Sequence, residues 1–172
     1  YQSTVNYCDH DVEKIMLIFG GSDPANLSTI VLKELLGMNK RFKVSLVLGS
    51  GFSHCTDLDV VMKNNNSPTE IKVFENINNI AEMMSRQDVV FTSPGLSFFE
   101  SLAVGTPVIG FHQNELQKKS YQEIIPTVDK ENIGTLVSMI SNKEFIFADD
   151  EVIKCMEIGE GIETIIEEIL LP

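Results

Sequence analysis

Short apolar runs alternate with segments of helical periodicity along most of this chain, and this rhythm constrains the fold more than any other feature. Alternating strands and helices are typical of a parallel sheet with helices on both faces. We therefore predict a Rossmann-like three-layer α/β/α domain with a sheet of about six parallel strands. The expected strands cover residues 14–19, 43–48, 71–74, 89–92, 108–111 and 127–128.

Helices are expected between these strands, where apolar residues recur at helical spacing. Asp23 is the expected N-cap of the first helix, with Pro24 at its first position, and Ser93 and Pro94 play the same parts in the fourth. The predicted helices cover residues 24–35, 57–63, 77–85, 94–103, 116–124 and 129–140. A last helix has glutamates on a solvated face and, on the other, Ile158, Ile162, Ile165 and Ile169.

The length of 172 residues fits one domain with a substantial core. Residues 1–13 are polar and irregular, so we interpret them as a linker that enters a domain covering residues 14–172. No apolar run is long enough to span a bilayer and no signal peptide is evident, so we expect no transmembrane segment. Cys8, Cys55 and Cys155 have neither metal-ligand nor redox-motif spacing, which favours reduced thiols in a cytoplasmic protein over one disulfide with a free thiol.

The formal net charge of −12 excludes one class of partner. No stripe of lysine and arginine is present, so nucleic acid is not an expected partner. A protein this negative is expected to bind phosphate through backbone N–H groups and helix ends rather than through lysines.

Two strand-to-helix turns place small residues before an expected helix, at residues 20–22 and at residues 93–97. Free N–H groups at a helix N-terminus attract phosphate, so two such turns predict a site for a nucleotide diphosphate. Gly20 and Gly21 would let the backbone approach a ligand closely. The first turn is neither a Walker loop nor a dinucleotide fingerprint, and a ligand-free tight turn is at least as good an interpretation of it alone.

Glu100 lies one helical turn inside the second of these helices. With Ser93 and Ser97 it would share one face, while Leu96, Phe99 and Ala103 would pack on the sheet. A carboxylate suits the two hydroxyl donors of a ribose. From the spacing alone, a ribose ligand and a surface carboxylate are equally good interpretations of Glu100.

Two further segments follow expected strands and would lie at the same sheet edge. Ile77 and Asn78 can face a base through their backbone or simply begin a helix. The polar stretch at residues 112–117 can bind sugar hydroxyls or form a solvated loop. No histidine stands beside a nucleophile and no cluster has metal-ligand spacing, so we predict no metal and no cofactor, and we assign no catalytic residue.

The segments at residues 73–84, 88–97 and 100–109 together resemble the C-terminal, nucleotide-binding half of GT-B glycosyltransferases of the family 28 type. The most specific part is Glu100 followed by Gly105-Thr106-Pro107. Within this superfamily the similarity is strongest to the UDP-N-acetylglucosamine transferase that forms lipid II and to the UDP-sugar hydrolase of pseudaminic acid biosynthesis. Gly20-Gly21-Ser22-Asp23-Pro24 is especially similar to the hydrolase branch.

The resemblance implies a role for each matching position. Glu100 would bind the ribose, residues 93–97 and Ser22 the diphosphate, residues 77–78 the uracil, and residues after the fifth strand the sugar. Relatives differ in having an adjacent Asn-Gln pair where this chain has Gln113-Asn114, with Gln117 further on. The predicted substrate-binding residues are Gly20, Gly21, Ser22, Ile77, Asn78, Ser93, Gly95, Leu96, Ser97, Glu100, Asn114 and Gln117.

The resemblance also implies that half of an active site is present. GT-B enzymes have an N-terminal domain that supplies the other side of the cleft and the catalytic base, and this chain has no room for it, so we expect the chain to be inactive alone. The leading hypothesis is the UDP-sugar-binding half of a hydrolase in nonulosonic acid biosynthesis. The alternatives are a UDP-sugar glycosyltransferase, a hydrolysing sugar epimerase, or a non-catalytic sugar-nucleotide-binding module fused to a sugar-activating enzyme.

Overall fold

Across the residues that the structure describes, the sheet has six strands, all parallel, in the order β3-β2-β1-β4-β5-β6. A computed structural model describes residues 11–121 and 127–146. The parallel strands and their order confirm the predicted Rossmann-like sheet. The strands are β1 (Lys14–Ile18), β2 (Lys43–Leu48), β3 (Glu70–Glu75), β4 (Val89–Thr92), β5 (Val108–Phe111) and β6 (Thr127–Val128).

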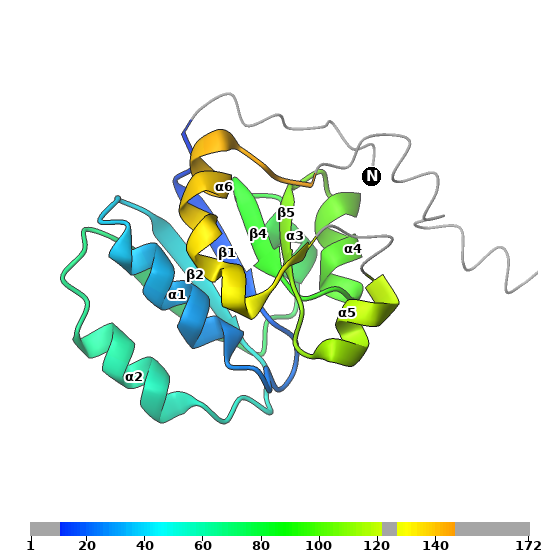
Figure 1. The fold of residues 1–172 in the computed structure, drawn as a ribbon, viewed down its shortest axis with the longest axis horizontal. Helices are drawn as coiled ribbons and strands as arrows, with labels where there is room; N and C mark the ends of the chain where they lie inside the picture. The colour runs from blue at the N-terminus through cyan, green and yellow to red at the C-terminus, as the bar shows by residue number, and fades with distance from the viewer. Residues whose placement is uncertain (1–10, 122–126, 147–172) are drawn as a thin grey trace, which may run out of the picture.

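Helices cover both faces of the sheet, and Figure 1 shows α1, α2 and α6 on the viewer's side of it. Apolar residues of α3, α4 and α5 pack on the opposite face. The helices are α1 (Leu27–Gly37), α2 (Cys55–Lys63), α3 (Ile80–Met84), α4 (Leu96–Ala103), α5 (Glu115–Tyr121), the 3-10 helix η1 (Lys130–Thr135) and α6 (Leu136–Asn142). None of the described helices is long and apolar enough to cross a bilayer.

The core is divided by the sheet into two layers, because successive side chains of a strand point to opposite faces. In β1, Ile15 and Leu17 pack with α1 and α6, whereas Met16 and Ile18 pack with α3. All four are buried. The near-continuous apolar sequence of β1 therefore reflects a strand covered on both sides.

The strand order reverses between β1 and β4, and this is the topological switch point of the sheet. Their pairing ends with Ile18 opposite Thr92. Because every strand is parallel, the turns at residues 20–22 and 93–97 both follow carboxyl ends at the same edge of the sheet, as the sequence predicted. Open parallel sheets bind ligands at such a position.

Helices α1 and α4 begin later than expected, so neither Asp23 nor Ser93 occupies the N-cap position. Helix α1 begins at Leu27 after Asn26, which has a left-handed φ of 56°. Helix α4 begins at Leu96 after Gly95, whose φ of 157° interrupts the helical conformation expected from Pro94. As a result Ser93 lies outside α4, and it does not share a helix face with Glu100.

The later start of α4 also changes which residues pack on the sheet. Leu96 is 76% exposed, so the expectation that it packs on the sheet was wrong. Phe98 and Leu102 are fully buried in its place. Leu96 is instead presented at the carboxyl edge of the sheet, beside the candidate site.

Other boundaries also differ from those expected. Helix α3 begins at Ile80, capped by the Asn79 side chain, which accepts the Glu82 N–H at 3.2 Å. The single helix expected from Asp129 is divided into η1 and α6. The Cys55 thiol is free and exposed. The end of the helix expected at residues 116–124, the C-terminal isoleucine face and residues 1–10 of the expected linker lie outside the described residues.

Candidate functional site

Gln113, which follows β5, holds the turn between β1 and α1. Its Nε2 donates to the carbonyl oxygen of Phe19 at 3.0 Å and to Oδ1 of Asp23 at 3.1 Å. Its Oε1 accepts the N–H of Ala25 at 3.1 Å. One side chain therefore fixes the first turn relative to β5.

Gln117 extends this connection to the turn that precedes α4. Its Oε1 accepts the backbone N–H of Gln113 at 2.7 Å, and its Nε2 donates to the carbonyl oxygen of Pro94 at 2.6 Å. We refer to Gln113 and Gln117 as the two-glutamine bridge. Through this bridge the turns after β1, β4 and β5 form one hydrogen-bonded unit.

The N-terminus of α1 is occupied by a carboxylate from the chain itself. Asp23 accepts the N–H groups of Leu27 and Ser28, each at 2.8 Å, and its residue is only 2% exposed. A carboxylate at this position satisfies orphan N–H donors and the positive end of the helix dipole. The α1 end is therefore closed to a phosphate group.

The N-terminus of α4 is open. Gly95 makes no side-chain capping bond, and no described residue has an atom within 4 Å of a Cβ built there. In the described part of the chain, the N–H groups of Leu96 and Ser97 meet no acceptor. Two N–H donors and the positive end of the α4 dipole are consequently available to an anion.

The first turn is exposed and held in place by the loop that follows β2. Gly20 has a left-handed φ of 81°, and in the described ranges no atom lies within 4 Å of a Cβ built on Gly20 or Gly21. The carbonyl oxygen of Gly21 accepts the N–H of Gly51 at 2.9 Å. A Cβ on Gly49 would lie 2.3 Å from that same oxygen, so only glycine fits. Ser22 is exposed at the tip.

Glu100 and Ser97 lie one turn apart on α4 and are both half-buried. In the structure as described, the Glu100 carboxylate makes no hydrogen bond or ion pair. A carboxylate without a partner beside an open helix N-terminus can accept hydroxyl donors from a ligand that binds there.

The remaining predicted residues flank this centre. Ile77 packs on the face that carries Ile18, and Asn78 is exposed in the same loop. Asn114 caps α5, accepting the N–H of Gln117 at 2.9 Å. Gln117 has bonded one amide hydrogen, so it keeps a second donor for a ligand.

Buried polar atoms without a partner are concentrated at this edge. In the described ranges, the buried side-chain atoms that lack a hydrogen bond are Asn26 Oδ1, Thr29 Oγ1, Ser93 Oγ and His112 Nδ1. Asn26 and Thr29 are at the start of α1, Ser93 follows β4 and His112 follows β5. Leaving a buried polar atom unsatisfied is costly, which indicates that water or a ligand completes these groups.

His112 is buried and titratable, and Oγ1 of Thr127 contacts its Nε2. The pKa of His112 is lowered from its ordinary value of 6.5, and burial is the largest cause. The negative charges of Asp129 and Glu115 raise this pKa and the positive charge of Lys118 lowers it, but each has a smaller effect than burial. Lys118 pairs with Asp129 at 2.8 Å. His112 is therefore neutral near pH 7, and it links β5 to β6.

Comparison with known proteins identifies the family. The glycosyltransferase family 28 C-terminal domain matches residues 15–142, which contain the sheet and both turns. The chain belongs to this family. It is therefore a family 28 C-terminal domain of the GT-B superfamily, with a role related to sugar nucleotides.

The chain is also similar to curated relatives. An uncharacterized protein of Methanocaldococcus jannaschii is 38% identical over 159 residues, which is 92% of this chain and 31% of the relative. The spore coat polysaccharide biosynthesis protein SpsG of Bacillus subtilis is 28% identical over 109 residues, 62% of this chain and 31% of that protein. The chain thus spans about a third of the length of these relatives.

Two solved structures share the fold at 14% sequence identity. MurG of Acinetobacter baumannii matches with a TM-score of 0.59 over 80% of this chain and 43% of its own. A putative UDP-N-acetylglucosamine 2-epimerase of Listeria monocytogenes matches with a TM-score of 0.52 over 83% and 40%. The predicted half of a GT-B fold is confirmed.

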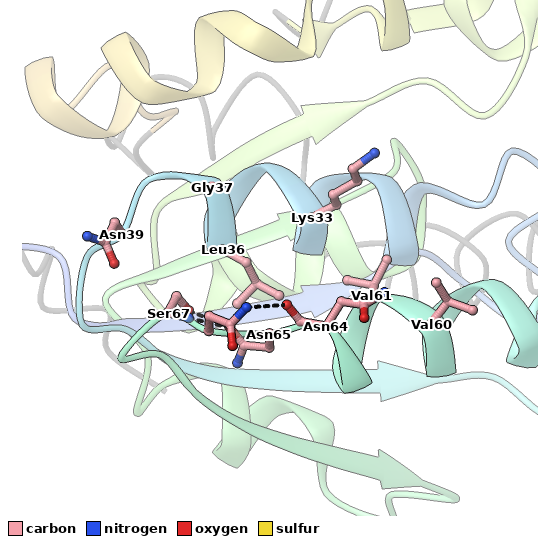
Figure 2. A pocket seen from close by; sticks show the side chains of 10 residues that line it. Lys33, Leu36, Gly37, Asn39, Val60, Val61, Asn64, Asn65 and Ser67 are labelled. Atoms are coloured by element: carbon pink, nitrogen blue, oxygen red, sulfur yellow. Dashed lines mark hydrogen bonds between the residues drawn. The ribbon is translucent and has the colours of Figure 1, made fainter.

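A groove of about 550 Å³ in this family 28 domain lies far from the candidate site, between the C-terminal ends of α1 and α2 (Figure 2). Leu36 and Val61 line it, with asparagines beside them. Oδ1 of Asn65 already accepts the N–H and the hydroxyl of Ser67. Because these polar groups bond to each other, the groove has little to orient a ligand.

Sequence reasoning missed three parts of the site. Gln113 was one of several polar residues after the fifth strand, and nothing in its neighbourhood indicated that it bonds to the first turn. Asp23 was expected to cap a helix that starts beside it. Gly49 and Gly51 were not considered, although Gly49-Ser50-Gly51 after an expected strand is a detectable signal of a close backbone approach.

Across the described residues, no cluster of possible metal ligands is present.

Proposed function

We propose that this domain binds the UDP part of a UDP-sugar at the carboxyl edge between β1 and β4, with the diphosphate on the N-terminus of α4. The observation that carries the proposal is the difference between the two helix ends. Asp23 fills the α1 end, whereas the N–H groups of Leu96 and Ser97 are open. The unpartnered Oγ of Ser93 supports the same position with a further hydroxyl. The exposed Gly20, Gly21 and Ser22 face the diphosphate from the other side.

The ribose is assigned to Glu100. Two vicinal hydroxyls present two donors, and one carboxylate accepts both. Glu100 lies one helical turn from Ser97, so a ribose bonded to it leaves the diphosphate near the α4 end. The uracil is assigned to the backbone of Ile77 and Asn78, and the sugar to Asn114 and the remaining amide hydrogen of Gln117.

The reaction proposed for the whole enzyme is hydrolysis of the bond between UDP and the anomeric carbon of its sugar, in nonulosonic acid biosynthesis. The similarity of the opening Gly-Gly-Ser-Asp-Pro segment to the hydrolase branch favours hydrolysis. An N-terminal domain of the same polypeptide would provide the rest of the cleft and the catalytic base. Because the chain spans about a third of its curated relatives, their length allows for such a domain.

A glycosyltransferase is the second candidate, because the family that matches residues 15–142 is named for this activity. Both reactions use the same UDP-binding half. They differ in whether water or a sugar hydroxyl enters from the opposite domain, so the UDP contacts proposed above are the same for both.

Calorimetry with UDP on the purified chain tests the binding proposal. We expect weak binding of UDP and no release of UDP from a UDP-N-acetylhexosamine, because the described residues include no base with an orienting partner beside the α4 end. Absence of UDP binding would refute the proposal. Sustained turnover by the chain alone would place the catalytic group within these residues and refute the division of roles.

A further inference from the structure

We propose that Gln113 is a positioning residue that sets the separation between the two turns on either side of the diphosphate. The inference rests on the proposed function. Gln113 itself is not assigned a ligand contact. Its role follows from the bonds that its amide makes to the first turn and from the bond between its own N–H and Gln117.

The orientation of the Gln113 amide is determined by its partners. Both amide hydrogens are used, one on the carbonyl oxygen of Phe19 and one on the carboxylate of Asp23. Reversing the amide would place Oε1 against these two acceptors and Nε2 against the N–H of Ala25. The half-buried side chain is therefore held in one conformation.

The bridge acts where the sheet no longer holds the strands together. Pairing between β1 and β4 ends at Ile18 and Thr92, and both turns lie beyond this pair. Beyond this pair, the Gln113 side chain bonds to Phe19 and Asp23 of the first turn. The Gln117 side chain then joins the Gln113 N–H to the carbonyl oxygen of Pro94 in the second turn. A site that is already spaced correctly loses less conformational freedom when a diphosphate binds.

The test compares Gln113→Met with a matched control, Gln87→Met. Methionine keeps the length of the side chain and removes its hydrogen bonds. Gln87 is equally half-buried and donates to the carbonyl oxygen of Met83, but it lies just before β4 at the opposite edge of the sheet. Gln117→Met is a second variant that cuts only the links to Gln113 and Pro94. All measurements are made at a temperature where thermal unfolding shows each variant to be folded.

Without ligand, amide hydrogen exchange measured by NMR should be faster in Gln113→Met at the amides that are bonded to the two turns, and unchanged in Gln87→Met. These amides are those of Leu27, Gly51 and Phe98, which donate to Asp23, Gly21 and Gly95 respectively. With ligand, UDP should bind about tenfold more weakly to Gln113→Met than to the unaltered chain. Affinity for uridine, which has no phosphate, should be unchanged. A purely structural role would not separate the two ligands.

Unchanged UDP affinity in both glutamine-bridge variants would overturn the inference, and so would an equal loss for UDP and uridine. If the unaltered chain binds no UDP while exchange at the two turns still accelerates in Gln113→Met, then the proposed function fails and the bridge itself is supported. If exchange at the turns does not change, the inference fails whether or not UDP binds.

Discussion

Asp23 and Leu27 are joined by a hydrogen bond of 2.8 Å from the Leu27 N–H to the Asp23 carboxylate, although Asp23 lies outside α1. A second bond, from the Ser28 N–H, has the same length. The residue is almost fully buried, and its backbone has a left-handed φ of 44°. The carboxylate thus serves as a fixed anion at the end of α1, and a ligand must find its donors elsewhere.

Replacing Asp23 with glycine should lower the free energy of unfolding by about 2 kcal/mol, since two helix N–H groups lose their acceptor while the backbone conformation remains accessible. Urea unfolding measures this. Asn39→Gly is the control, because Asn39 has a similar φ of 50° on an exposed residue and should change stability by less than about 0.5 kcal/mol. Equal effects of the two substitutions would contradict the capping role of Asp23.

Gly49→Ala should destabilise the chain by at least about 2 kcal/mol, because the new Cβ would lie 2.3 Å from the Gly21 carbonyl oxygen and would displace the first turn. Gly37→Ala provides the contrast. No atom of the described residues lies within 4 Å of a Cβ at Gly37, and a helical alanine should raise stability by up to about 1 kcal/mol. Comparing the two unfolding midpoints checks this prediction, which fails if Gly49→Ala is as stable as Gly37→Ala.

Glu100→Gln should weaken UDP binding by roughly ten- to a hundredfold, because charge-assisted hydrogen bonds to a ribose are worth about 1.5–3 kcal/mol. Stability should hardly change, because this carboxylate has no partner among the described residues. Calorimetry with UDP and with 2′-deoxy-UDP checks the assignment. The unaltered chain should prefer UDP, and the variant should discriminate less. Full UDP affinity with a lower melting temperature would instead make Glu100 a structural residue.

Stability should fall as the pH drops below about 6.5, in part through His112. Burial lowers the pKa of His112 in the folded chain, so between that lowered pKa and 6.5 the unfolded chain binds a proton that the folded chain does not. The contribution of His112 to the free energy of unfolding is complete above pH 6.5. It is lost as the pH falls toward the lowered pKa of the folded chain. Urea unfolding at pH 7.5 and 5.5 should show a smaller difference for His112→Gln than for the unaltered chain. A His112→Gln variant that keeps the full difference would refute the assignment.

Much of the architecture could be predicted because it depends on local patterns. The buried run at β1 and the apolar spacing of α1 are visible within a few residues, and they fix the α/β class. The sequence also predicted that the two turns lie at the same edge of the sheet, since parallel strands bring their carboxyl ends together. The resemblance then supplied the family, which the match to residues 15–142 confirms.

Helix starts were less predictable because they depend on single backbone conformations. The sequence predicted that Gly95 lies inside a helix that begins at Pro94. Its φ of 157° is not helical, so α4 begins only at the next residue, Leu96. Leu96 therefore lies at the first helical position and is exposed, although its apolar side chain favoured a place against the sheet. Propensity describes an average over many chains, and here the turn geometry outweighed it.

The sequence by itself determined the parallel α/β sheet, the family and the two turns at one edge, because each is encoded in short-range periodicity or in a contiguous motif. Only the tertiary structure decided which helix N–H groups at those turns already have an acceptor among the described residues. The bond from Gln113 to Asp23 crosses 90 positions of sequence, and the clash at Gly49 involves a backbone atom of Gly21. Such contacts depend on how whole elements pack in space, so no local pattern records them. They close the α1 end to an anion and leave the α4 end open.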